Sequence, residues 1–459
     1  MLKEPLLREL ESIVGKQSIL TSPESLKAYS YDGTTDWQHE PDVVVFPTTA
    51  DQISQIMKIA NREKIPVTPR GGGTNVSGGS IPILGGIVLA MTKMNKILKI
   101  DKENLSATVE PGVVLQDLTL ALAKEGLFFP PDPQSMLGAT LGGIISENAG
   151  GPACVKYGVT KQYILGLEVV LPTGEITHFG GRTIKNVVGY DLMHIFISGE
   201  GTLGVVTRAE LKLNPLPQAK KSIMAVYNDM VAAGETVFRV LEKGIIPGKI
   251  EFLDNYIINR IEEMVPIGLP LDADAVLLFE VDGIPEAIEK EAAGITALAK
   301  QYGAREVRLA KDQAEADQYW MARKAGFAAT FGKTPTVKNE DVTVPRGKIP
   351  DLLNKVKSIA KKYDVTISVL GHAGDGNLHP AILTDRKNKE HYERALKAMD
   401  EIIESAAELG GVVAGEHGIG LEKQKFFRKT MDPVAVDLMI KIKKLLDPQN
   451  IMNPGKIWD

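Results

Sequence analysis

Residues 69–79 read PRGGGTNVSGG, and this stretch limits the folds open to the chain. Five glycines in eleven residues exclude a stable helix or a central strand. In such a loop, backbone N–H groups can converge on an anion because no side chains obstruct the approach. Arg70 would add positive charge, and Thr74 and Asn75 would add hydrogen-bonding side chains. The alternative is a flexible surface loop; it is not a P-loop, because no Gly-Lys-Ser/Thr follows.

A second glycine-rich stretch, PPDPQSMLGATLGGIISENAGGP, covers residues 130–152. It is too apolar for a linker, and we predict that it is too glycine-rich for a core helix. Its small residues between positions 138 and 143 would let the backbone press against a flat or extended ligand. Two such loops in one domain favour a cofactor that carries a diphosphate.

Residues 199–204, GEGTLG, match the dinucleotide pattern G-x-G-x-x-G. That pattern requires a helix after the glycines and an acidic residue about 20 positions later. Here the following VVTRAELKL has the composition of a strand, and position 224 is methionine. We therefore reject a Rossmann-type site.

Three of the seven histidines lie in two short motifs, GHAGDGNLHP at 371–380 and GEHGIG at 415–420. A loop at the end of an apolar strand, 366–370, could bring His372 and His379 to one point. Two imidazoles and the Glu416 carboxylate suit zinc, iron(II) or manganese(II) with positions left open for substrate oxygens. His417 would remain available as a base near neutral pH. The alternative is that these side chains cap strands or satisfy buried carbonyls.

The remaining pattern predicts an α+β chain of several segments. Residues 1–30 contain short helices, and Thr49 begins a helix with a capping pattern that ends at Gln52. Pro215 and Pro217 mark a boundary, after which a second α+β domain follows. A last helix has Asp432 as its N-cap. The predicted strands cover 42–46, 87–91, 107–110, 166–171, 204–213, 275–281 and 366–370.

Composition excludes several classes of function. The chain of 459 residues has a net charge of −5 and no basic tract, which argues against nucleic-acid binding. The single cysteine, Cys154, excludes an internal disulfide and a cysteine-ligated iron–sulfur cluster. Its scarcity fits a reducing compartment, and we expect a cytoplasmic protein. The N-terminus lacks the apolar core of a signal peptide, and no apolar run is long enough to span a membrane.

The motifs quoted above, with the terminal NPGKIWD and in this order, resemble the FAD-linked 2-hydroxyacid dehydrogenases of the vanillyl-alcohol-oxidase fold. That family includes the glycolate oxidase FAD subunit, D-lactate dehydrogenases and D-2-hydroxyglutarate dehydrogenase. The resemblance covers roughly residues 35–459. It implies a two-lobed FAD-binding domain of the PCMH type from residues 1–217, with its core beginning at about 38, and from the returning segment 411–459. Residues 218–410 would form an α+β cap domain of antiparallel sheet and helices.

The resemblance also implies a set of cofactor-binding residues. The FAD pyrophosphate would be held by Arg70, Gly71, Gly72, Gly73, Thr74, Asn75, Gly78 and Gly79. The rest of the cofactor would be lined by Pro131, Asp132, Ser135, Gly138, Ala139, Thr140, Gly142, Gly143, Asn148, Gly201 and Val206. Asn453 would lie near the flavin. Because the loops carry neither His nor Cys near the expected attachment point, we expect FAD that is not covalently attached.

By the same resemblance, His372, His379 and Glu416 would bind a divalent metal, and His417 would be the base. Arg323, in YWMARKAGF, would bind the substrate carboxylate, and Lys338 occupies a position similar to a second carboxylate-binding lysine. Groups that would recognise a second substrate carboxylate are not evident, which favours lactate or glycolate over 2-hydroxyglutarate. Among these substrates we expect D-lactate first and glycolate next.

The reaction implied is hydride transfer from C2 of the acid to flavin N5, with electrons then passed to a partner such as an electron-transfer flavoprotein or an iron–sulfur subunit. The alternatives are an alkyl-transferring flavoenzyme of the same fold and a flavin-carrying subunit that only relays electrons.

Overall fold

The computed structural model describes residues 2–34, 36–332 and 334–458, and these divide into two compact units. The first unit contains the chain up to Ala149, Val159–Leu216 and the chain from Glu416 onward. The second contains Gly150–Gly158 and Pro217–Gly415. The sequence predicted that the second domain begins after residue 217 and ends at residue 410. In the structure the second unit begins after residue 216 and ends at residue 415. The sequence did not predict that Gly150–Gly158 belongs with the second unit.

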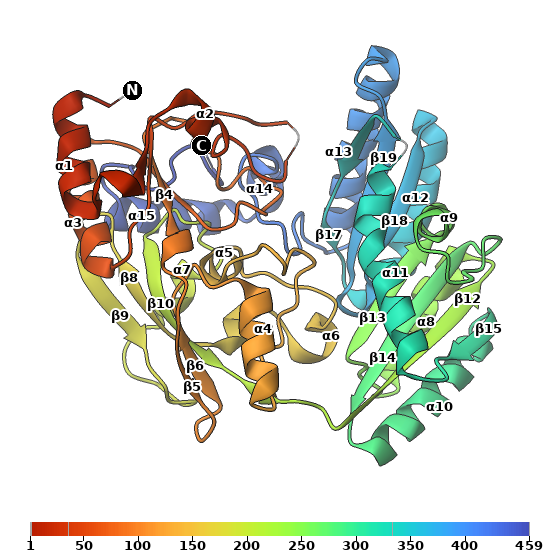
Figure 1. The fold of residues 1–459 in the computed structure, drawn as a ribbon. Coiled ribbons are helices and arrows are strands. Elements are labelled where there is room, and N and C mark those ends of the chain that lie inside the picture. Colours follow the sequence, from red (N-terminus) through yellow and green to blue (C-terminus); the bar gives the residue numbers. More distant parts are fainter. Residues whose placement is uncertain (1, 35, 333, 459) are drawn as a thin grey trace. The chain divides into compact units, whose positions relative to one another are not determined.

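The first unit contains two sheets and a short ribbon (Figure 1). In the first sheet the strands lie in the order β1 (Ile19–Leu20), β2 (Val43–Val45), β4 (Ile87–Ala90) and β3 (Val67–Arg70), and the last three are parallel. The second sheet is antiparallel, in the order β5 (Ile97–Asp101), β6 (Ser106–Val109), β10 (Val205–Lys212), β8 (Ile164–Val170) and β9 (Ile176–Gly180). Strands β7 (Leu127–Phe128) and β11 (Asn214–Pro215) form the ribbon.

The helices of the first unit are α1 (Glu4–Val14), α2 (Pro23–Lys27), α3 (Ala50–Glu63), α4 (Leu115–Lys124), α5 (Leu141–Glu147), α7 (Met193–Phe196), α14 (Gln424–Thr430) and α15 (Pro433–Leu446). Two predicted helix starts are confirmed. The Thr49 hydroxyl accepts a hydrogen bond from the backbone N–H of Gln52, and the Asp432 carboxylate accepts bonds from the first turn of α15. On α15, however, Val434, Leu438 and Leu445 stay exposed.

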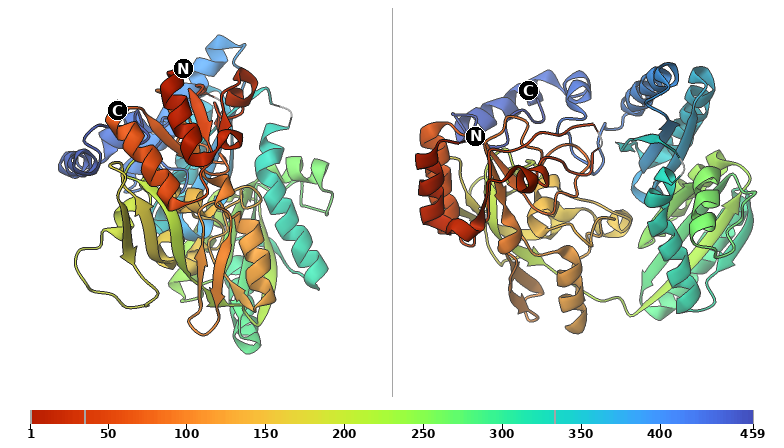
Figure 2. Two further views of the ribbon diagram at one scale, coloured as in Figure 1. Left: turned by 60° about the vertical axis from the view of Figure 1, so that its left-hand side comes forward. Right: turned by 45° about the horizontal axis from the view of Figure 1, so that its top comes forward.

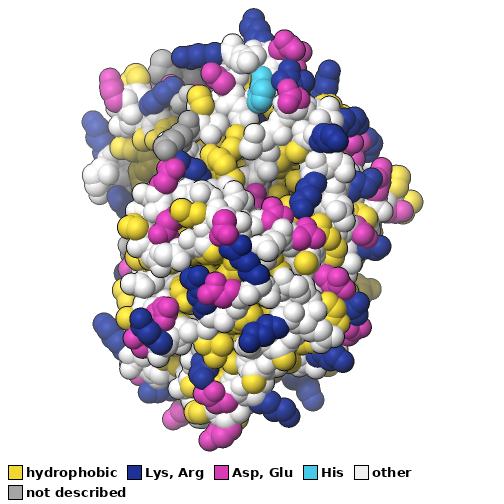
Figure 3. Space-filling model, turned by 90° about the vertical axis from the view of Figure 1, so that its right-hand side faces the viewer, with side chains coloured by type: hydrophobic (Ala, Val, Ile, Leu, Met, Phe, Trp, Pro, Cys, Tyr) yellow, Lys and Arg dark blue, Asp and Glu magenta, His cyan; other side chains and the backbone are white. Residues whose placement is uncertain are grey.

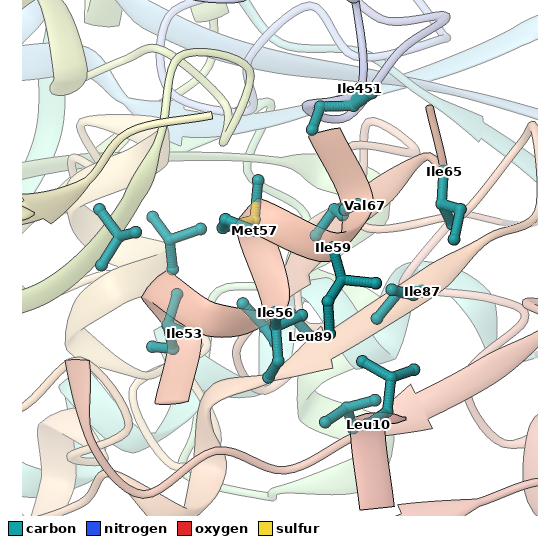
Figure 4. Close-up of a cluster of buried hydrophobic side chains, with 14 of the residues drawn as sticks. Leu10, Ile53, Ile56, Met57, Ile59, Ile65, Val67, Ile87, Leu89 and Ile451 are labelled. Carbon is teal, nitrogen blue, oxygen red and sulfur yellow. The ribbon is translucent and has the colours of Figure 1, made fainter. Parts of the chain in front are cut away.

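One apolar core joins the N-terminal helices, the parallel strands and the C-terminal segment of the first unit (Figure 4). Ile53, Ile56 and Met57 project from one side of α3 and are fully buried. Ile451, from the end of the chain, lies in the same core, and its carbonyl accepts a 2.7 Å hydrogen bond from the N–H of Val67. The returning segment is therefore an integral part of this unit.

One prediction for the first unit is wrong. The stretch 130–152 contains a helix, α5, despite Gly142 and Gly143. A Cβ on Gly142 would lie 2.8 Å from Cβ of Pro111, so the glycine permits close packing. Leu141, Ile144 and Ile145 are buried. Tertiary burial of these three side chains outweighs the low helix propensity of two glycines.

The second unit has one antiparallel sheet with helices on both faces. Its strands, in spatial order, are β15 (Ala304–Leu309), β12 (Ala219–Tyr227), β14 (Ala275–Gly283), β13 (Lys249–Asp254), β18 (Thr366–His372), β19 (Asn377–Thr384) and β16 (Thr336–Asn339), and β17 (Val342–Thr343) also pairs with β19. Helices α9 (Asn255–Met264) and α11 (Gln313–Phe331) pack together over one face. The remaining helices are α6 (Cys154–Tyr157), α8 (Met230–Glu242), α10 (Pro285–Gln301), α12 (Ile349–Tyr363) and α13 (Lys389–Glu408). Of these, α12 and α13 lie side by side (Figure 2).

Helix α6 is the helix of the Gly150–Gly158 segment. Its attachment to the second unit has a clear polar basis, because the Lys156 ammonium and the Tyr157 hydroxyl both donate to the buried Asp282 carboxylate, at 2.5 and 2.6 Å.

The molecular surface agrees with the composition. On the face drawn in Figure 3, basic and acidic side chains are interspersed, as on a solvated surface rather than a nucleic-acid-binding one. Within the described residues, no helix combines the length and the apolar character that crossing a bilayer requires.

Candidate active site

The two glycine-rich loops of the first unit meet each other. A Cβ on Gly72 would lie 2.1 Å from the carbonyl oxygen of Gly138, and one on Gly71 would lie 2.1 Å from Oγ1 of Thr140. No larger residue fits at these two positions, so the backbones of the loops lie directly against each other. The sequence predicted two glycine-rich loops, and the structure brings them together.

Polar side chains hold the first loop in place. The buried Arg70 guanidinium donates to the hydroxyl of Ser80 at 3.2 Å, and that hydroxyl donates to the Asn75 carboxamide at 2.8 Å. The same carboxamide donates to the Asp32 carboxylate at 2.7 Å. Sequence reasoning missed Asp32, which lies outside any glycine-rich motif.

The junction of the loops fits a ligand that accepts hydrogen bonds. The hydroxyl of Thr140 is buried between them and has no hydrogen-bond partner among the described residues. Buried hydroxyl groups are normally paired, so a ligand oxygen is a natural partner. The glycine cradle and this hydroxyl together suit the pyrophosphate of FAD.

The other predicted cofactor residues also lie in the first unit. Asn148 ends α5 in the left-handed region at φ 53°, Gly201 forms the turn before β10 at φ 68°, and Val206 is buried in β10. Pro131, Asp132 and Ser135 precede α5 in the chain. The Asn453 carboxamide donates to the carbonyls of Gly79 and Glu200, each at 2.8 Å. Asn453 therefore connects the terminal motif to both the PRGGGTNVSGG loop and the GEGTLG motif.

In the second unit, strand alternation places three polar side chains on one face of the sheet. His379 pairs with Leu370 across the β18–β19 ladder, so His372 and His379 leave the sheet on the same side. Glu251 shares the side of Leu253, which packs against α9 and α11. The two imidazole centroids are 5.3 Å apart and almost perpendicular. Between the strands a single 3-10 turn, Ala373–Asp375, replaces the predicted loop.

Glu416 completes a set of possible metal ligands. One nitrogen from each of His372 and His379 and one Glu416 carboxylate oxygen all lie within 4.8 Å of one another. Glu416 directly follows Gly415, whose N–H donates to the Asp341 carboxylate at 2.8 Å. The three side chains predicted from two distant motifs are thus gathered at one point.

The buried Glu251 carboxylate links this cluster to a cation. One oxygen is 2.8 Å from Nδ1 of His372, and the other is 2.5 Å from Nε of Arg323 on α11. Complete burial by itself would raise the pKa of Glu251, but the charges and hydrogen bonds of Arg323 and His372 lower it below its ordinary value. A carboxylate on Nδ1 leaves Nε2 of His372 as the ligand atom and fixes the orientation of the ring.

Sequence reasoning missed Glu251, although a signal was present. It lies in β13, KIEFLD, between the fully buried Ile250 and Phe252. A carboxylate is rarely buried without a charged partner. An isolated acid within such an apolar run is therefore a marker for a partnered site.

Arg323 is 3% exposed, and its Nη2 has no hydrogen-bond partner among the described residues. A guanidinium has five N–H donors, and the ion pair with Glu251 is made through Nε. A buried cation with an unused donor fits an anionic ligand beside His372.

The other two predicted catalytic residues differ in position. His417 is partly buried, and its Nε2 lies 4.0 Å from the carboxylate of Glu416. Lys338 pairs with Ile382 in the β16–β19 ladder, so its side chain leaves the sheet on the side opposite to His379. Lys338 therefore lies on the face of the sheet opposite to the one that carries His372 and His379.

Comparisons with known proteins agree with this arrangement. Residues 41–180 match the family model described as FAD binding domain, and residues 216–457 match the model of the C-terminal domain of FAD linked oxidases. The chain belongs to the FAD-linked oxidase family. The chain is 44% identical to "Glycolate oxidase subunit GlcD" of Bacillus subtilis, over 100% of this chain and 97% of the relative. It is 34% identical to "D-lactate dehydrogenase" of Anaerostipes hadrus, over 98% of this chain and 97% of that one.

Solved structures define the fold of this FAD-linked oxidase. Substrate-bound p-cresol methylhydroxylase superposes with a TM-score of 0.83 over 99% of this chain and 96% of that one, at 20% identity. The predicted fold class, an FAD-binding domain of the vanillyl-alcohol-oxidase type with an α+β partner domain, is confirmed.

The residues around the His372, His379 and Glu416 cluster fit a divalent metal. Two imidazoles and one carboxylate form a common catalytic donor set. The Glu251 carboxylate lies 2.8 Å from Nδ1 of His372, and the Asp341 carboxylate lies farther, 4.0 Å, from Nδ1 of His379. Outer carboxylates of this kind orient metal-binding imidazoles and raise their basicity.

Proposed function

We propose that this FAD-linked oxidase oxidises a small 2-hydroxy acid, D-lactate or glycolate, to the corresponding 2-oxo acid. The observation that carries the proposal is the Arg323–Glu251–His372 chain of contacts, which puts an unfilled anion-binding donor beside the cluster of possible metal ligands. A 2-hydroxy acid has a carboxylate and a hydroxyl on adjacent carbons, which suits such a pair of sites. The printed names of the two relatives support the same substrate class.

The roles of the chain's own residues follow from this geometry. Arg323 would bind the substrate carboxylate through its free Nη2, while Glu251 keeps the guanidinium in place. His417 would take the proton from the 2-hydroxyl. When bound, FAD supplies two-electron redox chemistry, and a divalent ion held by His372, His379 and Glu416 would supply Lewis acidity toward the substrate oxygens.

FAD would be held without a covalent bond, between the 69–79 and 130–152 loops, because neither loop contains a histidine or cysteine. Electrons would then leave to a partner protein, such as an electron-transfer flavoprotein or an iron–sulfur subunit. The word "subunit" in the name of the Bacillus subtilis relative supports a multi-subunit assembly. The lone Cys154 cannot ligate a cluster within this chain.

Anaerobic titration of the purified flavoprotein with D- and L-2-hydroxy acids tests the proposal. We expect D-lactate or glycolate to bleach the flavin absorption and to yield one equivalent of 2-oxo acid per flavin. A protein that only relays electrons would stay oxidised with every acid. Bleaching without a stable oxo acid, or products of alkyl transfer, would favour an alkyl-transferring flavoenzyme of the same fold instead.

Removal of divalent metal is expected to slow flavin reduction at least about tenfold, because the Lewis acidity of a bound metal stabilises the transition state by several kcal/mol. The measurement is flavin reduction after dialysis against a chelator, with zinc, manganese(II) or iron(II) then added back singly. The flavin spectrum should persist throughout as the control. An unchanged rate in metal-free protein would remove the metal from the mechanism.

A further inference from the structure

The GEGTLG motif, which does not bind a dinucleotide, contains a residue with an unusual set of contacts. Glu200 is buried and adopts the left-handed region at φ 49°. Its N–H donates to the carbonyl of Ser146 at 2.9 Å, and its own carbonyl accepts from Asn453 at 2.8 Å. A non-glycine residue in this region is uncommon, so its position is fixed by its surroundings.

The side chain of Glu200 holds two consecutive backbone N–H groups. One carboxylate oxygen accepts from Ile419 at 2.8 Å, and the other accepts from Gly420 at 2.7 Å. These residues lie two and three positions after His417. Hydrogen bonds from N–H groups to a charged carboxylate are among the strong ones. Glu200 therefore clamps the far end of the GEHGIG loop.

The near end of the same loop is also held by a carboxylate, because the N–H of Gly415 donates to Asp341. Glu416, His417 and Gly418 are thus bracketed by one carboxylate on each side. Gly418 lies at φ 80° and Gly420 at φ 48°, so the loop has no helical or strand geometry of its own to keep it rigid.

A second buried acid, Glu147, sits against the middle of the loop. A Cβ on Gly418 would lie 2.3 Å from one oxygen of Glu147 and 3.1 Å from one of Glu200. Burial and then the charge of Glu200 raise the pKa of Glu147 well above its ordinary value, and its Oε2 has no hydrogen-bond partner among the described residues. Burial also raises the pKa of Glu200, but the two loop N–H groups and Lys456 oppose that rise. Of the two carboxyl groups, Glu200 is therefore the one whose charged form its surroundings favour, through the two loop N–H groups and Lys456.

We propose that Glu200 is a positioning residue, whose carboxylate fixes the main chain that presents Glu416 and His417. The proposal deepens the function proposed above and rests on it only for the roles of those two residues. Glu200 would touch neither substrate nor metal, and it would act through the loop. This role explains the glutamate of the GEGTLG motif, which the interpretation of the motif as a dinucleotide-binding site does not explain.

The test compares Glu200→Gln with the matched control Glu147→Gln. In the first variant an amide N–H₂ must face one of the two loop N–H groups, so one of the two hydrogen bonds of the clamp is lost. In the second variant an amide of the same size replaces a carboxyl whose Oε2 has no hydrogen-bond partner among the described residues. Hydrogen–deuterium exchange of the peptide that contains residues 415–420 should be at least about tenfold faster in E200Q and unchanged in E147Q. E200Q should also bind manganese(II) about 10- to 100-fold more weakly, as measured by electron paramagnetic resonance.

Unchanged exchange of the loop peptide in E200Q would overturn the proposal, whether or not the protein oxidises 2-hydroxy acids. If E200Q does not fold, Glu200→Asp is used instead. It keeps the carboxylate but shortens the side chain by one methylene group, and hydrogen–deuterium exchange of the 415–420 peptide should again be faster than in the wild type. If the wild-type flavin is not reduced by any 2-hydroxy acid, the proposed function fails while the exchange comparison still decides the role of Glu200. Faster exchange in both variants equally would also contradict the assignment to Glu200.

Discussion

Replacing His417 with alanine is expected to slow reduction of the flavin by a 2-hydroxy acid about 10²- to 10⁴-fold, while FAD stays bound. General-base catalysis contributes a factor of this size. No residue of the glycine-rich loops is altered, so the visible spectrum of the bound flavin should be unchanged. Stopped-flow absorbance under anaerobic conditions measures the rate, and the rate profile against pH should lose the inflection that belongs to the base.

The matched control for this variant is His178→Ala. The His178 side chain is 62% exposed and bonds to Glu168 on the neighbouring strand, so its loss should leave the rate unchanged. Because His417 adjoins Glu416, the metal content of H417A should be measured by plasma mass spectrometry. A normal rate would remove His417 as the base, and loss of rate together with loss of metal would reassign it to the metal site.

The sequence predicted the parts of the site that reside in short motifs. His372, His379 and Glu416 were identified because glycines frame them, and glycine-framed polar residues stand out against an ordinary background. The PRGGGTNVSGG loop was identified for the same reason. Local composition carries this information, since the backbone geometry of such loops depends on the absence of side chains.

The parts that sequence reasoning missed depend on three-dimensional neighbours. Glu251 is distant in sequence from both Arg323 and His372, and only strand alternation and the β13–β18 pairing bring it to them. Helix α5 formed despite two glycines because Pro111 and a buried apolar face lie against it. Lys338 was predicted from a family position, and the register of the β16–β19 ladder, which the sequence does not reveal, decides on which face of the sheet its side chain lies. Tertiary contacts, not local preference, decide each of these cases.

The second large effect is expected from Arg323, which should combine a loss of substrate binding with a loss of stability. In Arg323→Met, the substrate carboxylate loses its charged partner, and kcat/KM for the acid should fall about 10²- to 10³-fold. The same change leaves the fully buried Glu251 carboxylate without its closest cation. Removing one partner of a buried ion pair costs about 3–5 kcal/mol of unfolding free energy.

The double variant Arg323→Met with Glu251→Gln separates these two effects. Neutralising Glu251 removes the uncompensated charge, so most of the lost unfolding free energy should return, as measured by denaturant titration followed by circular dichroism. The value of kcat/KM should stay at least as low as in R323M, because no cation then faces the substrate carboxylate and His372 also loses the carboxylate on its Nδ1. If both the unfolding free energy and kcat/KM recovered in the double variant, Arg323 would act only by stabilising the second unit. Persistence of normal activity in R323M would require a different residue to bind the acid, and the carboxylate clamp assigned here would be wrong.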